Sequence, residues 1–302
     1  LKIIEKENYR PHRQKKSDRR KKRESIGVIF AREDQPLSIN PFYSRVLEGI
    51  EAALALNNFN LVLHLLPGIL KNDLPKMIRD EHVDGIILVS VLNPEFISRI
   101  VRLDIPVVLV DSRSNENSFC QVLIDNEHGA LLATNYLIQN GHHRIGFISG
   151  DLTRWSFKQR FDGYCKALEY NRINLDKDLV ATGGLEQGYD HVMRLLSLSD
   201  PPTAIFSAND INAIYGYKAV LDSGLRIPED VSFVGFDDIG MAKMSSPPLT
   251  TIRVYKEEMG SIAVRRLLSL LYDHNSECSI SLVPTRLVER ESVRKLNTTQ
   301  GR

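Results

Sequence analysis

Short, almost continuously apolar runs alternate with longer helical patterns along this chain, and this alternation constrains its fold more than any other feature. In the first part of the chain the expected strands are Ser25–Ala31, Asn60–Leu66, Asp84–Leu92 and Ile105–Asp111. Strands that are apolar on both faces and separated by helices predict a parallel sheet that helices cover on both sides. The expected fold class is therefore α/β, with a doubly wound sheet.

The same alternation returns after about residue 145. The runs "RIGFISG", "TAIFSAND" and "DVSFVGFDD" read as strands, and "KQRFDGYCKALEYN" and "INAIYGYKAVLDSG" read as the helices between them. The length of 302 residues also favours two lobes, because domains commonly hold about 150 residues. We therefore expect two doubly wound parallel-sheet lobes with a cleft at the carboxyl ends of their strands, and polar residues just after each strand should face it.

Charge divides the chain into a basic arm and an acidic body. Residues 1–24 carry eleven Lys or Arg against four Asp or Glu, whereas residues 25–302 carry 28 against 34. The near-neutral total therefore hides two regions of opposite sign. The arm either neutralises phosphates of nucleic acid or is a solvated, disordered linker, and both hold if it becomes ordered only on DNA.

Several functional classes find no support in the sequence. No stretch approaches the roughly 20 apolar residues of a membrane span, and no signal peptide opens the chain, so we expect a soluble cytoplasmic protein without a membrane partner. Cys120, Cys165 and Cys278 lack the spacing of a disulfide frame or a zinc site. The sequence contains no nucleophile-elbow motif (GxSxG), no zinc-metalloprotease motif (HExxH), no phosphate-binding loop (GxxxxGKS/T) and no complete dinucleotide-binding motif. We therefore expect no enzyme activity, cofactor or metal. His142 and His143, at a helix end, are interpreted as structural.

Motifs spread in order over nearly the whole chain carry a family resemblance: "LKIIEKENYRP", "NPFY", "VLIDNEHGALLATNYLIQNGHHRIGFISG", "RFDGYCKAL", "SANDINAIYGYKAVLDSGLRIPEDVSFVGFDDI", "SSPPLTTIRVYKEEMGSIAVRRLLSLL" and "PTRLVERESV". They resemble the lactose/galactose-repressor (LacI/GalR) family of bacterial transcription regulators. The resemblance implies a helix-turn-helix, a hinge, and a two-lobed core of the periplasmic-binding-protein-like type I. The chain of such a core crosses between the lobes three times, the core forms a homodimer, and a small effector in the cleft controls affinity for operator DNA.

The resemblance also implies domain boundaries. Leu1–Pro11 matches the end of the DNA-binding headpiece, so most of the helix-turn-helix is expected upstream of Leu1 in a longer protein. The expected division is residues 1–24 for the headpiece end and hinge, 25–147 with 254–281 for the N-terminal lobe, 148–253 with 282–295 for the C-terminal lobe, and 296–302 for the tail.

In the hinge, the position that matches the family's minor-groove leucine holds Asp18, and a carboxylate cannot wedge between base steps. What remains for the arm is contact with the DNA backbone, which positions a protein without specifying sequence. For this chain we therefore expect weak, salt-sensitive binding to any duplex. The expected backbone contacts are Arg13, Lys15, Lys16, Arg19 and Arg20, joined by Lys21, Lys22 and Arg23.

Seven positions match effector contacts of the family: Phe42, Tyr43, Arg154, Ser156, Arg160, Asn209 and Asp237. An aromatic ring packs on a sugar's C–H face, an arginine fork donates to ligand oxygens, and a carboxylate at a strand end accepts from two hydroxyls. Purely structural roles are also possible for some of these residues. Phe42 and Tyr43 can pack the first helix against the core, and either Asn209 or Asp210 can cap a helix while the other faces the cleft. Asp238 is interpreted as a turn or cap residue.

One family feature is missing, because the match to an effector-stacking aromatic falls on Gly183, or on Leu185 with a short deletion. A monosaccharide or small glycoside is the first expectation for the effector, and a purine or phosphorylated metabolite is the second. The predicted function is a transcriptional regulator that binds rather than catalyses. The main alternative is a solute-binding protein of a transport system, which would share the core; an enzyme on the same scaffold is a third.

Overall fold

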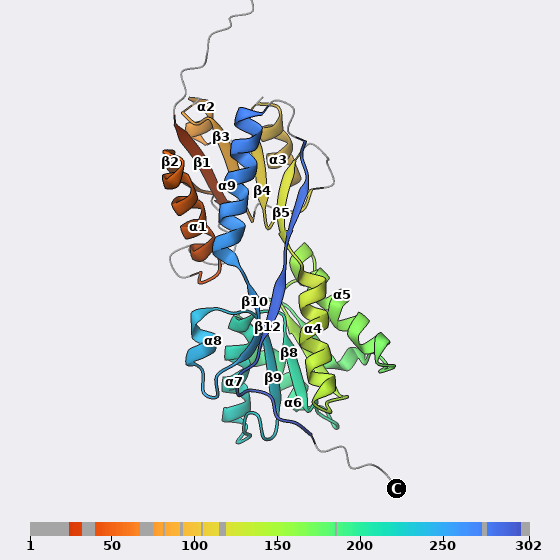
Figure 1. Ribbon diagram of the computed structural model, residues 1–302. Helices are drawn as coiled ribbons and strands as arrows, with labels where there is room; N and C mark the ends of the chain where they lie inside the picture. Colours follow the sequence, from red (N-terminus) through yellow and green to blue (C-terminus); the bar gives the residue numbers. More distant parts are fainter. Residues whose placement is uncertain are drawn as a thin grey trace, which may run out of the picture.

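The computed structural model describes residues 24–31, 40–66, 75–80, 82–90, 93–103, 105–114, 119–184, 186–273 and 277–296. These residues form two α/β lobes stacked end to end and joined by three crossing segments (Figure 1). Each lobe contains a six-stranded sheet with helices packed against it, as the sequence predicted. Within the described residues, no helix combines the length and the apolar character needed to cross a bilayer.

The N-terminal lobe is built on a fully parallel sheet in the order β11-β5-β4-β3-β1-β2. Every residue of its central strands β3, β4 and β5 is buried, which explains their unbroken apolar sequences. The strands are β1 Ser25–Ala31, β2 Asn60–Leu66, β3 Gly85–Val89, β4 Val107–Val110, β5 Cys120–Ile124 and β11 Ile280–Val283. The helices of this lobe are α1 Tyr43–Leu56, α2 Lys76–Arg79, α3 Pro94–Val101 and α9 Lys256–Tyr272.

The C-terminal lobe repeats this plan with the order β12-β10-β9-β8-β6-β7, in which only the β10–β12 pair is antiparallel. Its strands are β6 Ile145–Ser149, β7 Val180–Thr182, β8 Ala204–Ser207, β9 Ser232–Asp237, β10 Thr250–Val254 and β12 Thr285–Val288. Its helices are α4 Asn126–Gln139, α5 Trp155–Tyr170, α6 Gly188–Leu196, α7 Asp210–Asp222 and α8 Gly240–Met244, with a 3₁₀ turn at Lys177–Leu179.

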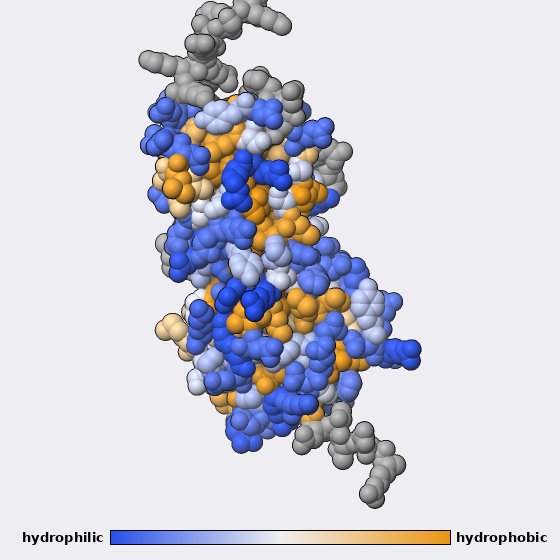
Figure 2. All heavy atoms as spheres, in the orientation of Figure 1, coloured by the Kyte–Doolittle hydropathy of each residue, from blue (hydrophilic) through white to orange (hydrophobic). Residues whose placement is uncertain are grey.

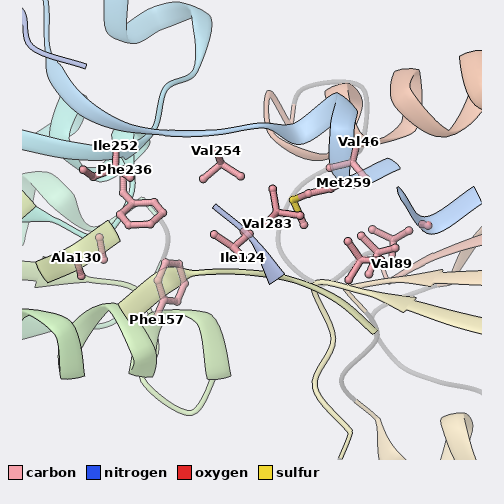
Figure 3. Close-up of a cluster of buried hydrophobic side chains, with 14 of the residues drawn as sticks. Val46, Val89, Ile124, Ala130, Phe157, Phe236, Ile252, Val254, Met259 and Val283 are labelled. Carbon is pink, nitrogen blue, oxygen red and sulfur yellow. The ribbon is translucent and has the colours of Figure 1, made fainter. Parts of the chain in front are cut away.

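The three crossings lie at Asp125, Tyr255 and Pro284. Just before each crossing the chain places a buried aliphatic side chain, Ile124, Val254 or Val283, in the cluster that continues from one lobe into the other. Figure 3 shows these three side chains close together, between residues of the C-terminal lobe on one side and of the N-terminal lobe on the other. The junction is therefore a packed apolar neck.

The predicted boundary at residue 147 differs from this arrangement. Strand β5 belongs to the first sheet, but helix α4, which follows it, packs on α5 and against the second sheet. A strand-helix-strand pattern looks the same whether its helix closes one lobe or opens the next, so the sequence pattern did not locate this crossing. The other two predicted boundaries, at 253/254 and 281/282, lie within three residues of the observed crossings at Tyr255 and Pro284.

Two glycines bring α1 and α9 into direct contact beside the cleft. A Cβ atom on Gly49 would lie 2.0 Å from the carbonyl oxygen of Glu257, and one on Gly260 would lie 2.4 Å from that of Val46. Both distances are far below van der Waals contact, so only glycine allows this approach. The close packing holds α1, at whose start Phe42 and Tyr43 lie, against α9, the helix that follows the crossing at Tyr255.

Candidate functional site

All seven residues predicted to bind the effector line one cavity between the lobes, with about 530 Å³ of empty space including its open mouth. Phe42 and Tyr43 come from the N-terminal lobe, and the other five come from the C-terminal lobe. Four more residues complete the lining: Asn40, Asp111, Phe157 and Ile211. The cavity thus takes walls from both lobes, so a ligand inside it would touch both at once.

On the N-terminal lobe, Tyr43 is held by hydrogen bonds at its hydroxyl. It donates to Oδ2 of Asp111 at 2.7 Å and shares a 2.9 Å hydrogen bond with the hydroxyl of Ser90. The other carboxylate oxygen of Asp111, Oδ1, is buried and has no hydrogen-bond partner within the described part of the chain. Burial raises the pKa of Asp111, and burial also raises the pKa of Tyr43. A ligand that donates to Oδ1 would relieve this cost.

The backbone bends sharply where the strands end at the cavity. Ser90, Asp111 and Asp237, at the carboxyl ends of β3, β4 and β9, have positive φ angles of 55°, 51° and 109°. Residues other than glycine seldom adopt such conformations, and where they do they gather at functional sites. This strain directs short polar side chains to the strand ends that face the other lobe, which is where doubly wound folds bind ligands.

Arg160 is the central cation of the C-terminal wall and is only 4% exposed. Its Nε donates to Oδ1 of Asn126 at 2.8 Å, and its Nη1 donates to the carbonyl of Ala208 at 2.6 Å. The guanidinium also lies 3.8 Å from the ring centroid of Phe236. These contacts fix the plane of the guanidinium group. Arg160 is therefore a buried residue of the cavity wall and does not lie on the helix surface.

Asp237 lies opposite Arg160 at the end of β9 and is 8% exposed. Its Oδ1 is 3.2 Å from Nη1 of Arg160, close enough for an ion pair but not aligned as a hydrogen bond, so that buried oxygen keeps an unused acceptor. Burial raises the pKa of Asp237 to about 6, and the charges of Arg160 and Lys256 oppose that rise. The carboxylate is thus ready to accept a donor from a ligand.

Asn209 serves two purposes at the end of β8. Its side-chain oxygen accepts a hydrogen bond from the backbone N–H of Asn212 at 2.8 Å and so caps α7, and the same residue lines the cavity. Asp210 is not part of the lining; it is 1% exposed and accepts hydrogen bonds from the N–H of Ile239 and the hydroxyl of Thr251. The sequence predicted that one of the two residues caps the helix and the other faces the cleft, whereas Asn209 does both.

Asp210 provides a pH-dependent test of this side of the cleft. Burial, reinforced by the charge of Asp237, raises the pKa of Asp210 to about 8. Because the folded state holds this proton more tightly than the unfolded state, the associated stability is full below about pH 4 and is lost as the pH rises toward 8. We expect the free energy of unfolding to fall between pH 6 and 8, and this slope to flatten in Asp210→Asn, as urea denaturation would show. Equal slopes in both proteins would contradict a raised pKa.

Asp238 lies in the turn between β9 and α8 with a positive φ of 51°, and its carboxylate also forms ion pairs. Its carboxylate is 2.6 Å from Nε of Arg253 and 2.5 Å from Nη2 of Arg290, and these partners hold its pKa below the usual value although burial acts to raise it.

His142 is buried, with ring nitrogens 3.0 Å from the hydroxyl of Thr203 and 3.1 Å from the carbonyl of Arg294. It bonds to the protein, in keeping with a structural role.

Some predicted features fall elsewhere. Arg154 and Ser156 flank the start of α5 and line the cavity, with Trp155 half-buried between them. Gly183 is not in the lining, and Leu185 lies outside the described residues, as do Asp18 and all the basic residues of the arm. No group of three potential metal ligands occurs in the portion of the chain that is described.

Asp111 is the main site residue that sequence reasoning missed. It is the last residue of the run predicted as the strand Ile105–Asp111, and the expectation that polar residues after each strand face the cleft applied to it directly. Ser90, after β3, follows the same rule. Phe157 and Ile211 gave no such signal, because an apolar residue in the first turn of a helix is usually part of the core.

Two lobes that enclose a polar cleft are the architecture of a ligand-binding core. Comparison with known proteins gives the same class of protein. The family model of the periplasmic binding protein-like domain matches residues 134–293. The chain is 30% identical to the HTH-type transcriptional repressor PurR of Aliivibrio salmonicida, over 97% of this chain and 88% of the relative. It is 31% identical to the ribose operon repressor of Haemophilus influenzae, over 98% of this chain and 89% of the relative.

Among solved structures, a LacI family transcriptional regulator from Enterococcus faecium with bound ribose superposes with a TM-score of 0.79. It is 28% identical and covers 90% of this chain and 100% of its own. The chain therefore belongs to the LacI/GalR family of transcriptional regulators, as its motifs indicated. Its relatives regulate transcription, which points away from an enzyme.

Proposed function

We propose that this chain is the effector-binding and dimerisation core of a cytoplasmic DNA-binding repressor, and that its effector is a sugar or a small glycoside. The observation that carries the proposal is the pair of unused acceptors in the cavity. Asp111 from one lobe and Asp237 from the other each keep a buried oxygen without a hydrogen-bond partner among the described residues. A polyhydroxyl ligand supplies donors in several directions and can satisfy both.

The charges of the lining favour an uncharged ligand over the phosphorylated alternative. Two carboxylates, Asp111 and Asp237, stand against two guanidiniums, Arg154 and Arg160, so the ionised lining is neutral. An added phosphate would place about two negative charges beside the carboxylates. Phe42 and Phe157 supply aromatic rings of the kind that pack on the C–H face of a sugar. The ribose bound in the related Enterococcus faecium regulator supports the same ligand class.

A purine remains the second candidate, because a relative carries the name PurR. The aromatic ring that commonly packs on a sugar or a purine in the family is missing at Gly183, so this position does not distinguish the two ligands. The unused acceptors at Asp111 and Asp237 fit several hydroxyl donors better than one planar base. Family membership supports a repressor over the transport solute-binding protein that shares this architecture.

Titration with a panel of sugars tests the proposal. Trp155 is the only tryptophan and lies between two lining residues, Arg154 and Ser156, so its emission should change when a ligand enters. We expect saturable fluorescence changes with one or a few pentoses, hexoses or small glycosides, and none with the rest. A fluorescence response to purine bases and to no sugar would identify the effector as a purine. No response to either class would contradict the proposed ligand class.

The proposed dimer has a physical basis in exposed apolar side chains. Leu56 is 86% exposed and Leu63 41% exposed at α1 and the edge strand β2, and Met244 is 85% exposed on α8. In Figure 1, β2, α1 and α8 lie along the same edge of the molecule. A two-fold contact along this edge would cover side chains of both lobes and place both N-terminal arms on one side, as a palindromic operator requires.

We expect sedimentation at micromolar concentration to show a dimer without DNA. Met244→Glu should raise the dimer dissociation constant by about tenfold or more, because it places a charge in an apolar contact. Tyr170→Glu, at a side chain that is 69% exposed on α5, is the matched control and should leave the dimer intact. A wild-type chain that sediments as a monomer would contradict the proposed assembly.

A further inference from the structure

A second cavity lies at the junction of the lobes, with about 840 Å³ of empty space including its mouth. Its N-terminal-lobe wall includes Arg45 of α1 and Glu257 of α9, and its C-terminal-lobe wall includes Lys243 of α8 and Arg253 of β10. Figure 2 shows hydrophilic residues gathered at the waist between the two lobes. The cavity is therefore a polar space, distinct in lining from the proposed effector site.

The lining of this second cavity carries an excess of positive charge. Four cations, Arg45, Lys243, Arg253 and Lys256, face it together with only two carboxylates, Asp238 and Glu257. The excess of two positive charges matches a dianion. A phosphate monoester at neutral pH carries between about 1.5 and 2 negative charges.

The two carboxylates leave much of this charge available. Asp238 already pairs with Arg290, which is outside the lining, as well as with Arg253. Arg45 is 2.7 Å from Glu48, which lies outside the lining, and 3.9 Å from Glu257. All three side chains are more than half exposed, and exposed ion pairs of this kind contribute little. Lys243 is exposed and makes no ion pair with any described residue. An anion in the cavity would therefore find at least one cation that no carboxylate neutralises.

Lys256 adds a buried positive charge on the wall shared with the effector site. It is 6% exposed, and its ammonium donates to the backbone carbonyls of Asp237, Asp238 and Val254 rather than to a carboxylate. Asp237 itself lines the first cavity, so Lys256 of the second cavity directly contacts a residue of the first. Nearby carboxylates, Asp237 above all, offset part of the charge of Lys256, and the remainder adds to the attraction for an anion in the second cavity.

We propose that this second cavity binds a small phosphate-bearing anion, either inorganic phosphate or a phosphate monoester, held by Arg45, Lys243 and Arg253. The geometry suits that chemistry because guanidinium groups present paired N–H donors to phosphate oxygens and lysine adds a mobile point charge. The donors come from both lobes, so the bound anion ties the lobes together at their junction. It binds apart from the uncharged effector.

Calorimetric titration of the intact chain tests this site, with inorganic phosphate in one arm and glycerol 3-phosphate in the other, at constant ionic strength. We expect saturable binding in at least one arm. Tighter binding of glycerol 3-phosphate would identify a monoester site, and equal or tighter binding of phosphate would identify a site for the free ion. No saturable binding of either probe at millimolar concentration would overturn the proposal.

Variants locate the binding. The double substitution Arg45→Gln with Lys243→Gln should weaken it by about tenfold or more, because two charge-assisted contacts are lost. Lys218→Gln, which removes the same charge from an exposed position on α7, should leave it unchanged. The conservative pair Arg45→Lys with Lys243→Arg should retain most of the affinity. Undiminished binding in the Arg45→Gln, Lys243→Gln protein would show that phosphate binds elsewhere and would overturn the assignment.

Thermal unfolding gives an independent readout. Phosphate stabilises many proteins by exclusion from their surface, and that general effect should be equal in the wild-type chain and in the double glutamine variant. Specific binding adds a further rise of the midpoint only in the wild-type chain. Equal midpoint shifts in the two proteins would count against a site at Arg45 and Lys243.

Discussion

Replacing Arg160 by alanine should lower the free energy of unfolding by about 3–5 kcal/mol. The substitution removes the cation that pairs with buried Asp237, and it leaves the side chain of Asn126 and the carbonyl of Ala208 without their donors. It also removes the planar group that packs on Phe236. An unpaired buried charge is among the most destabilising changes a single substitution can make.

Urea denaturation of matched variants measures this effect. Lys158→Ala lies on the same helix with its side chain 51% exposed, and it should change the free energy of unfolding by less than about 0.5 kcal/mol. If Arg160→Ala lowered the free energy of unfolding no more than Lys158→Ala does, the contacts of Arg160 would not stabilise this wall of the cavity as described. The neighbouring lining residue Ser156 offers a second comparison, because Ser156→Ala removes a cavity hydroxyl without disturbing the buried network.

The sequence predicted the fold well where apolar runs were long. The bounds of β1 and β2 coincide with the predicted Ser25–Ala31 and Asn60–Leu66, although β1 is largely buried and β2 is a partly exposed edge strand. The crossing after β5 was missed, since which sheet α4 packs against depends on contacts between elements distant in sequence. Local periodicity specifies that an element is a helix, and it does not specify the lobe on which that helix lies.

The candidate site was predicted in part for a similar reason. Its seven expected residues came from family motifs, and they meet in one cavity. Asp111 and Ser90 were overlooked although strand ends were expected to face the cleft, because no motif marked them. The bonds that hold Arg160 could not be foreseen, because Asn126, Ala208 and Phe236 are remote from it in the chain and meet it only in the folded lobe.

Substituting Asp237 by alanine should weaken effector binding by about 2–4 kcal/mol, because it removes an acceptor and leaves ligand hydroxyls unpaired in a buried site. That loss corresponds to a dissociation constant raised by roughly 30-fold to 1,000-fold. The carboxylate oxygen concerned, Oδ1, makes no hydrogen bond within the described residues, so the bound ligand gains what the free protein lacks. Asp222→Ala, at an exposed carboxylate on α7, is the matched control and should leave the affinity unchanged.

Calorimetric titration of the wild-type chain and of Asp237→Ala with the sugar that changes Trp155 emission tests the central claim most directly. The account predicts saturable binding of one sugar molecule per wild-type chain, and a dissociation constant raised by roughly 30-fold to 1,000-fold in a variant whose unfolding still shows a folded core. A bound sugar whose affinity is the same in Asp237→Ala as in the wild-type chain would contradict the placement of the effector between the two lobes.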